Sequence, residues 1–575
     1  MKIILRFCLM PAFLAGAALA QPSIAAVQNN YSNIIRGMPN YGIAQGSVFT
    51  IFGSNLGPAQ TPVLPDLSQG PLATNLKGVT VQVTVNGTTV QAIPYYVSAT
   101  QIAAILPSRT PVGTGTVTVT FNNVASSQSQ ITVVPAAFGI DTLNGAGTGP
   151  AVAQNASDGY SLLSATSAAN PGETLVLWGS GIGPAQGDET KYPFAQVDQT
   201  NASAVQVYIG GQLVKPSYAG RSQFPGVDQI NVVVPPGVAG CNVSVVVQTG
   251  TGASTMVSNT ATIPVAASGR VCSDPASGGL TSSDLRDLLA KGTYRGGAII
   301  LGKATSQTPA ISIPGGPTIG GSVTAVDFAS ASFSEVIINQ VNAAQALPQF
   351  QLISLGSCTV YQVQGSQTAS LNVGIQSKAL DAGTLSMKVP NGSTINLTKS
   401  QNLGYSLSGS NATGSTSPLF IPDSGGQFTF SNTGADVGPF SASITLPPAI
   451  NWTNINSITD VNRGAGVTVT WDKTNPYSGF VTIMGNSYTA SNPSDPRTAI
   501  ASGFQCMAPY SAGAFTVPPY VLLAMTPSMT ISGVSVPTGL LSLSLSAQPV
   551  RFTAPGLDNG FIAAANSSGK LVNYK

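Results

Sequence analysis

Apolar and polar residues alternate along many short stretches of this chain. In residues 79–85, valine stands at every odd position and Thr or Gln at every even one. This period of two places the valines on one face of a β-strand. Asn86-Gly87 follows directly and is the strongest short hairpin signal. Residues 90–97 are therefore predicted to return as the partner strand, with Pro94 at an edge or a bulge.

Further short runs with strand character lie at 48–52, 102–106, 116–121 and 130–134. Residues 21–45 show no such pattern and are expected to be an irregular lead-in. Many short strands separated by frequent turns are typical of an immunoglobulin-like sandwich. The pattern predicts one such sandwich at residues 31–140.

One stretch occurs twice. The residues Gly46-Ser-Val-Phe-Thr-Ile-Phe-Gly-Ser-Asn-Leu-Gly-Pro-Ala-Gln60 return as Gly172-Glu-Thr-Leu-Val-Leu-Trp-Gly-Ser-Gly-Ile-Gly-Pro-Ala-Gln186. Each copy is a short apolar strand that runs into a Gly-rich turn. Because the strands after it also return in the same order, a second sandwich is expected at residues 141–268.

The remainder of the chain is β-rich but lacks the repeated stretch. Residues 269–292 are expected to be a linker with one short helix, capped by Thr281 and ended by Gly292. That helix either packs on a neighbouring domain or docks a partner. Residues 293–350 are expected to form a small β segment, and residues 351–575 a larger C-terminal β-sandwich. The predicted fold class is all-β.

The composition excludes several functions. Only 7% of residues are charged, against about 25% in an average soluble protein, so Ser, Thr, Asn and Gln must solvate the surface. The net charge of +2, without a basic run, predicts no nucleic-acid partner. The chain has no histidine, which rules out Ser-His-Asp and Cys-His catalysis and any zinc site that needs imidazole. No metal or other cofactor is expected.

The N-terminus is typical of an export signal. Lys2 and Arg6 precede an apolar core, and Ala18-Leu-Ala20 is a small-x-small cleavage pattern. Residues 1–20 are therefore predicted to be a signal peptide. No other stretch is long and apolar enough to span a membrane. The mature chain is expected to be extracellular or at the cell surface.

Four cysteines follow the signal segment: Cys241, Cys272, Cys358 and Cys506. An even number in an oxidising compartment favours disulfides, and four cysteines allow three pairings. The pairing that respects the expected domains joins Cys241 to Cys272 and Cys358 to Cys506. The alternative is four buried free thiols.

Few side chains suggest a catalytic or ligand-binding site. Gly179–Gly183 is glycine-rich, but Pro184 follows it and no helix pattern appears, which argues against nucleotide binding. Asp158 and the pair Asp188-Glu189 supply too few oxygens for a calcium site. They are interpreted as solvated loop acids.

Trp471, Asp472 and Tyr477 are the candidate ligand contacts. A ring that stacks on a sugar, beside a carboxylate that binds its hydroxyls, would form a carbohydrate platform. The alternative is that Trp471 packs in the core.

The repeated turns resemble a known family. Phe52-Gly-Ser-Asn-Leu-Gly-Pro58 and Trp178-Gly-Ser-Gly-Ile-Gly-Pro184 are similar to the Gly-x-Asn-Leu/Phe-Gly signature of IPT/TIG-type immunoglobulin-like domains. Both halves also resemble the tandem modules of uncharacterised secreted acidobacterial proteins, in which Val227-Asp-Gln-Ile-Asn-Val-Val-Val-Pro-Pro-Gly237 recurs near the module end. The first copy departs from that phrase at residues 98–107. The resemblance implies the fold and carries no enzymatic residues.

The C-terminal half resembles a β domain of the same secreted proteins. The similar stretches are Asp436–Ser443, Trp452–Asn454 and Phe504–Cys506.

These observations favour a non-catalytic binding or adhesion protein. Its expected partner is an extracellular ligand, either a glycan or an envelope protein. One alternative is a structural spacer of an extracellular matrix. The other is a carbohydrate-active enzyme with two acids within residues 293–575, which would need a separation of about 5–10 Å across a cleft.

Overall fold

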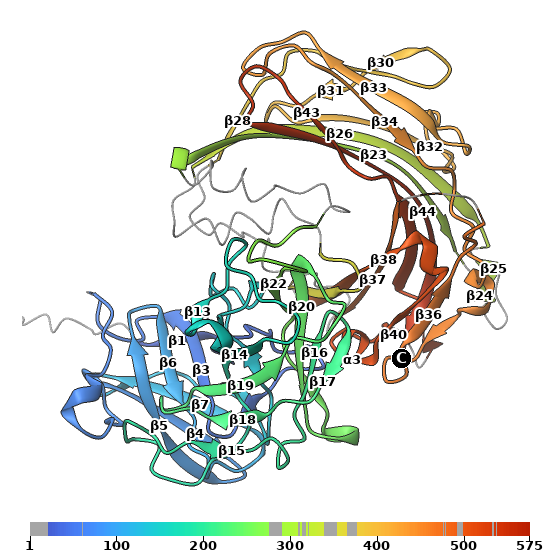
Figure 1. Cartoon of the computed structure of the whole chain (residues 1–575). Helices are drawn as coiled ribbons and strands as arrows, with labels where there is room; N and C mark the ends of the chain where they lie inside the picture. The colour runs from blue at the N-terminus through green and yellow to red at the C-terminus, as the bar shows by residue number, and fades with distance from the viewer. Residues whose placement is uncertain are drawn as a thin grey trace, which may run out of the picture.

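The computed structural model of this chain is built almost entirely of β-strands (Figure 1). It describes residues 21–575 except 60, 275–289, 309–310, 313–317, 320, 338–352, 365–376, 475–476, 478, 491–497, 532–533 and 536. The expected signal segment at 1–20 and most of the helix expected before Gly292 lie outside the described residues. The fold class is the predicted one: all-β, with tandem immunoglobulin-like sandwiches.

The first module consists of strands β1 to β9, which form one sheet folded over a single core. Phe49, Ile51 and Ile102 from one half of the sheet meet Val81 and Val83 from the other half in that core. The strand order is β1 (Ser23–Asn29), β3 (Val48–Ser54), β6 (Gln101–Ile105), β5 (Thr88–Val97), β4 (Val79–Val85), β7 (Gly113–Phe121), β9 (Ser129–Val134) and β2 (Ile43–Ala44), with β8 (Val124–Ala125) beside β7.

The hairpin turn and the strand irregularity of this module lie where the sequence predicts them. Asn86 and Gly87 have φ values of 50° and 78°, as a tight hairpin between β4 and β5 requires. The register of β5 against β6 shifts between Pro94 and Tyr96, so the predicted edge or bulge at Pro94 is a bulge. This bulge lies where β5 passes from one half of the sandwich to the other.

The lead-in expected at residues 21–45 is not irregular. Strand β1 pairs antiparallel with β3 from Ser23 opposite Ser54 to Asn29 opposite Phe49. Its sequence does not alternate, so periodicity could not detect it. The strand forms because β3 offers a sheet edge that β1 can extend.

The second module has two sheets around one core. Val207, Ile209, Ile230, Val232 and Val245 lie in that core. One sheet has the order β13 (Ser161–Leu162), β12 (Ala153–Asn155), β14 (Thr174–Ser180), β19 (Asp228–Val233), β18 (Tyr218–Arg221) and β15 (Val197–Asp198), with β10 (Gly139–Ile140) beside β14. The other has the order β11 (Gly149–Pro150), β22 (Ala261–Val265), β20 (Gly240–Thr249), β16 (Gln206–Ile209) and β17 (Gln212–Val214), with β21 (Met256–Val257) beside β20.

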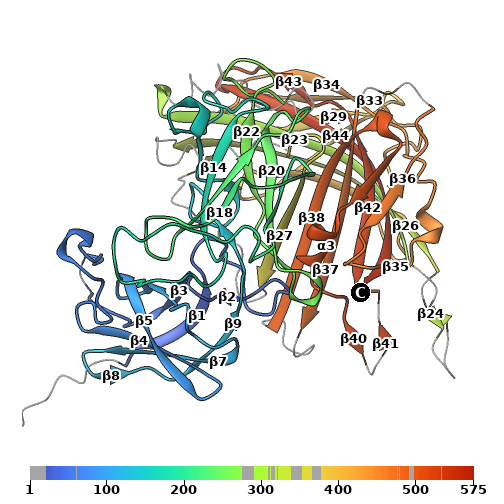
Figure 2. The same cartoon turned by 60° about the horizontal axis from the view of Figure 1, so that its bottom comes forward.

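The C-terminal region is organised by one large curved sheet, seen as an arc in Figure 1 and face-on in Figure 2. Its order is β27 (Cys358–Gln364), β38 (Ala499–Pro509), β37 (Phe480–Ala490), β42 (Gly539–Ser546), β44 (Asn559–Tyr574), β23 (Thr293–Gln307), β26 (Val323–Ile337), β32 (Tyr405–Ser410) and β31 (Thr398–Lys399). Off this path lie β28 (Ser377–Ala379), β35 (Asp460–Val461) and β43 (Val550–Phe552).

A second layer covers the part of the outer face of the arc that lies over β23 and β26 (Figure 1). It consists of β30 (Thr394–Asn396), β29 (Leu385–Lys388), β33 (Gly426–Asn432) and β34 (Ser441–Leu446). Smaller elements are the pairs β36 (Val467–Thr470) with β39 (Ala514–Val517), β24 (Ile311–Ser312) with β25 (Thr318–Ile319), and β40 (Thr530–Ile531) with β41 (Val534–Ser535), and helix α3 (Pro519–Leu523).

The large sheet crosses the division expected between residues 350 and 351. Strand β23 pairs in parallel with β44 from Gly296 opposite Asn559 to Gln307 opposite Lys570. These partners are far apart in the chain, and local periodicity carries no information about such pairing.

The three parts of the molecule are bonded to one another. Between the modules, the amide of Val48 donates to Ser180 Oγ at 2.9 Å, so the two copies of the repeated stretch are directly joined. Between the second module and the C-terminal region, the rings of Tyr208 and Tyr520 lie 4.2 Å apart between centroids. The first module reaches the same region through Gln362, described below. The chain is therefore a packed assembly of modules.

Candidate functional site

A cleft of about 1280 Å³ lies where the first module, the second module and the C-terminal region meet. Ligand pockets are usually about 300–1,000 Å³, so this cleft has room for an oligomeric ligand. Among the described residues that line it there is no Asp, Glu, Lys or Arg. The lining combines amides and hydroxyls with a larger share of apolar groups.

The first wall is the outer face of strands β1, β3 and β6. Ala26 lies opposite Phe52, and Gln28 opposite Thr50; Phe52 in turn lies opposite Gln101. Residues directly opposite in a sheet share one face. All five line the cleft, so this face presents two glutamine amides around a phenylalanine ring.

The second wall is β27, the end strand of the large sheet. Tyr361 lies opposite Gly503 of β38, and a Cβ atom at position 503 would overlap the tyrosine ring. The ring thus lies over the glycine backbone while Tyr361 remains 48% exposed. Partial burial raises the pKa of its hydroxyl, so the side chain is neutral at physiological pH.

The third side consists of residues 145–148 and 258–260 of the second module. Asn259 fixes these loops, since its Nδ2 donates to the carbonyls of Ile140 at 3.0 Å and Gly147 at 2.9 Å. Nearby, Asn40 Nδ2 donates to the Val257 carbonyl at 3.0 Å. The Oδ1 atom of Asn40 accepts no hydrogen bond from the described residues, although the side chain is 8% exposed.

The walls are held in place by hydrogen bonds between the parts. Gln362 Oε1 accepts from the Ile35 amide at 3.3 Å, and its Nε2 donates to the Asn33 carbonyl at 3.1 Å. On the other side of β27, Ser357 Oγ accepts from the Ser244 amide at 3.0 Å. Because these bonds tie β27 to both modules, the cleft is preorganised.

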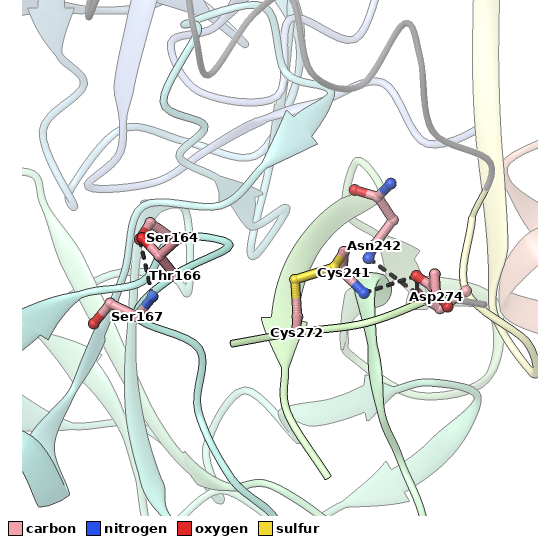
Figure 3. The surroundings of a disulfide bond; sticks show 8 residues. Ser164, Thr166, Ser167, Cys241, Asn242, Cys272 and Asp274 are labelled. Atoms are coloured by element: carbon pink, nitrogen blue, oxygen red, sulfur yellow. Dashed lines mark hydrogen bonds between the residues drawn. A yellow bond between two sulfur atoms is a disulfide. The ribbon is translucent and has the colours of Figure 1, made fainter. Parts of the chain in front are cut away.

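Both expected disulfides are present: Cys241 with Cys272, and Cys358 with Cys506. Beside the first, Asp274 accepts from the Cys241 amide at 2.7 Å and from Ser354 Oγ at 2.6 Å (Figure 3). Burial raises the pKa of Asp274, and these hydrogen bonds oppose the rise. The second disulfide joins opposite residues of β27 and β38, and so secures the strand that carries Tyr361.

The glycine-rich turn at 179–183 has a structural role. Its amides at Gly181 and Ile182 donate to Asp228 Oδ2 at 2.7 and 2.9 Å. Arg221 Nη1 lies 3.2 Å from the other oxygen of Asp228, and both side chains are buried. The N–H groups that would bind a phosphate are occupied by this carboxylate, which supports the argument against a nucleotide site.

The carbohydrate platform expected at Trp471 does not form. Trp471 is 3% exposed and its Nε1 donates to the Tyr510 carbonyl at 2.8 Å. Tyr477 packs edge-on against Tyr510 with 5.9 Å between ring centroids, and Asp472 accepts from the Thr474 amide at 2.9 Å. The tryptophan ring is part of the core because Trp471 continues the alternation of Val467 and Val469, which lie in the same core cluster, so no sugar can stack on it.

The loop acids of the second module form ion pairs or hydrogen bonds with other residues of the protein. Asp158 lies 3.8 Å from Arg270, and Asp188 lies 3.9 Å from Lys191. Glu189 accepts from the Ser108 amide of the first module at 3.0 Å. In the part of the chain that the structure describes, no cluster of three or more metal-ligating side chains is present, and no helix there has the length and apolar character to cross a membrane.

Sequence reasoning missed the residues that line the cleft. Residues 26–30 carry no alternating pattern, and their amides do not stand out because amides are abundant throughout the chain. Tyr361 had no signal at all, since its place depends on strand β38, more than a hundred residues later.

Comparison with known proteins supports the modular description. The model of the IPT/TIG domain family matches residues 36–134 and 160–263. No curated protein matches the chain. Titin Ig tandem domains A164–A165 are a similar solved structure, with 11% identity, 39% of this chain and 90% of that chain covered, and a TM-score of 0.12.

The tandem Ig repeats of Dlar are another, with 12% identity, 43% of this chain and 97% of that chain covered, and a TM-score of 0.12. Similarity at this level says nothing about what the present chain binds. The family match ends before the large C-terminal sheet begins. The chain thus carries two tandem immunoglobulin-like modules that are similar to the IPT/TIG domain.

Proposed function

We propose that this protein is an exported, non-catalytic binding protein whose ligand site is the cleft between the modules and β27. The observation that carries the proposal is the cleft itself: a large preformed hollow, built from three separate parts of the chain, with polar side chains that face into it. Clefts between domains are common positions for ligand sites.

Export is supported by the N-terminal signal pattern and by the two disulfides, which persist in oxidising compartments. The resemblance to the modules of secreted acidobacterial proteins points the same way. Attachment to the cell surface and a role in adhesion belong to this proposal.

The packing of the parts favours binding over a spacer role. A spacer gains length from modules in an extended row. Here the first module instead contacts the distant C-terminal region through Gln362 and through Ile500, which packs on Ile34, Ile35 and Met38.

A catalytic role has less support. Hydrolysis by two carboxylates needs both acids at the substrate, and the described lining of the cleft contains none. In the C-terminal region, Asp327 is instead buried and accepts from the amides of Phe420 and Ile421 at 2.7 and 2.6 Å.

A binding screen of the mature chain against glycans, peptidoglycan and cell envelopes tests the proposal. The variant Ala26→Trp places a large ring on the cleft-facing side of β1 and is expected to abolish binding. Ala125→Trp, at an exposed position of β8 outside the cleft lining, is the matched control and should bind as the wild type does. Binding that survives Ala26→Trp, or turnover of a substrate without binding in the screen, would refute the proposal.

A further inference from the structure

The absence of charge from the described cleft lining restricts the ligand. A charged group that leaves water for this cleft would meet no counter-ion, and burial of an unpaired charge is costly. Sites for phosphate or carboxylate ligands use Arg or Lys, and the described lining offers neither. The ligand is therefore neutral where it contacts the walls.

The polar groups of the cleft can both donate and accept. Each glutamine or asparagine amide has two N–H donors and a carbonyl acceptor. Gln28 and Gln101 point from one sheet face into the cleft and make no side-chain hydrogen bond with a described residue. A ligand rich in hydroxyl groups matches this set, because a hydroxyl also donates and accepts.

An open aromatic face completes the site. Tyr361 lies over the backbone of Gly503 and is 48% exposed, so one face of its ring is supported and the other is open. Phe52, on the first wall, also lines the cleft. Flat apolar rings beside neutral hydrogen-bonding groups suit a molecule with an apolar C–H face and a polar rim, as a pyranose ring has.

We propose that the cleft binds a neutral oligosaccharide, with one sugar ring stacked on Tyr361 and hydroxyls of neighbouring sugars bonded to Gln28 and Gln101. This inference rests on the proposed function, since it names the ligand class of the same cleft. The cleft volume of about 1280 Å³ exceeds that of a pocket for a single small molecule, which favours an oligomer over a monosaccharide.

Calorimetric titration of the mature chain tests the inference. The neutral probes are maltohexaose, cellohexaose, laminarihexaose and chitohexaose, and the contrasting probes are an oligogalacturonate and a peptide prepared from envelope protein. At least one neutral probe should bind, with an affinity that is nearly independent of salt because no ion pair forms. The Ala26→Trp variant should not bind it.

The variant Tyr361→Ala is expected to weaken that binding roughly tenfold or more, the usual loss when a central aromatic contact is truncated. Tyr361→Phe keeps the ring and should retain most of the affinity. Tyr160→Ala is the matched control: Tyr160 is 60% exposed and lies outside the cleft lining, and its loss should leave binding unchanged. Circular dichroism verifies that each variant is folded.

Two results would overturn the inference in different ways. If the acidic probe or the peptide binds, and Ala26→Trp abolishes that binding, the cleft is a binding site but not for a neutral sugar. The proposed function then holds, and the inference of a neutral oligosaccharide is wrong. If a neutral sugar binds and neither Ala26→Trp nor Tyr361→Ala weakens it, the cleft is not the site and both proposals fall.

Discussion

Removal of the buried carboxylate at Asp228 should destabilise the second module more than removal of its cationic partner. Asp228 accepts two backbone N–H groups of the repeated turn and pairs with Arg221 at 3.2 Å. In Asp228→Ala the amides of Gly181 and Ile182 lose their acceptor, and the guanidinium keeps an unpaired charge. Truncation of one partner of a buried ion pair costs about 3–5 kcal/mol, and we expect a loss in that range.

Arg221→Met should cost less, about 1.5–3 kcal/mol, the scale of one lost hydrogen bond to a charged group. The guanidinium makes one hydrogen bond, from Nη2 to the Gly183 carbonyl at 3.2 Å, while its Nε atom has no acceptor among the described residues. Asp228 would keep both amide donors in that variant. Burial raises the pKa of Asp228, whereas Arg221 and the two amides oppose the rise; the carboxyl can therefore take up a proton when Arg221 is absent.

Urea unfolding followed by tryptophan fluorescence gives the free energies, because Trp178 lies on β14 next to the turn. Hydrogen exchange of residues 174–183 assigns the change to this module. Asp198→Ala is the control, since that carboxylate is exposed and accepts its side-chain hydrogen bond from the nearby Thr200, and its loss should stay within about 0.5 kcal/mol. The reasoning fails if Arg221→Met costs as much as Asp228→Ala, or if Asp228→Ala matches the control.

Three other predictions follow from the packing. Burial raises the pKa of Asp141 from 3.8 to about 6, so this carboxyl binds a proton more tightly in the folded state, and its contribution to stability is fully present only below about pH 4. That contribution should be lost as the pH rises through 6. Asp141→Asn should remove this pH dependence of the free energy of unfolding, measured by urea titration at several pH values, and should stabilise the protein by at most about 3 kcal/mol at neutral pH. An unchanged pH dependence would contradict the raised pKa of Asp141. Replacement of Cys358 and Cys506 by serine removes a disulfide with a sequence separation of 148. This change should lower the free energy of unfolding by up to about 5 kcal/mol and speed hydrogen exchange in β27. Protection of β27 at the wild-type level would show that hydrogen bonds alone secure the strand. A double-mutant cycle of Tyr208→Ala and Tyr520→Ala, measured by calorimetric melting, should give a coupling of about 0.5–1.5 kcal/mol between the second module and the C-terminal region. Additive effects would mean that contact between these rings does not couple the two.

Some parts of the fold could be read from short stretches of sequence. The β4–β5 hairpin is an example, because valine alternation and Asn86-Gly87 are local signals that need no distant partner. The repeated stretch likewise predicted two copies of one module. The disulfides were predictable because the cysteines were few and the expected domains limited their pairing.

The candidate site was beyond such reasoning. Trp471 looked available as a stacking platform, yet its ring is buried; the useful ring is that of Tyr361, which only the pairing of β27 with β38 places over Gly503. The alternation of Val467, Val469 and Trp471 already favoured the buried side for Trp471, whereas no local pattern reveals which side of β27 is open at Tyr361.

The difference between what local sequence patterns predict and what only the tertiary structure shows has a physical cause. The sequence by itself determined the strand type, the turns, the modular repeat and the lack of histidine chemistry, since these depend on residues a few positions apart. Only the tertiary structure decided that β23 and β44 share one sheet and that Gln362 bonds to the first module. The cleft exists because these contacts join chain segments hundreds of residues apart, and no local pattern of apolar and polar residues encodes them.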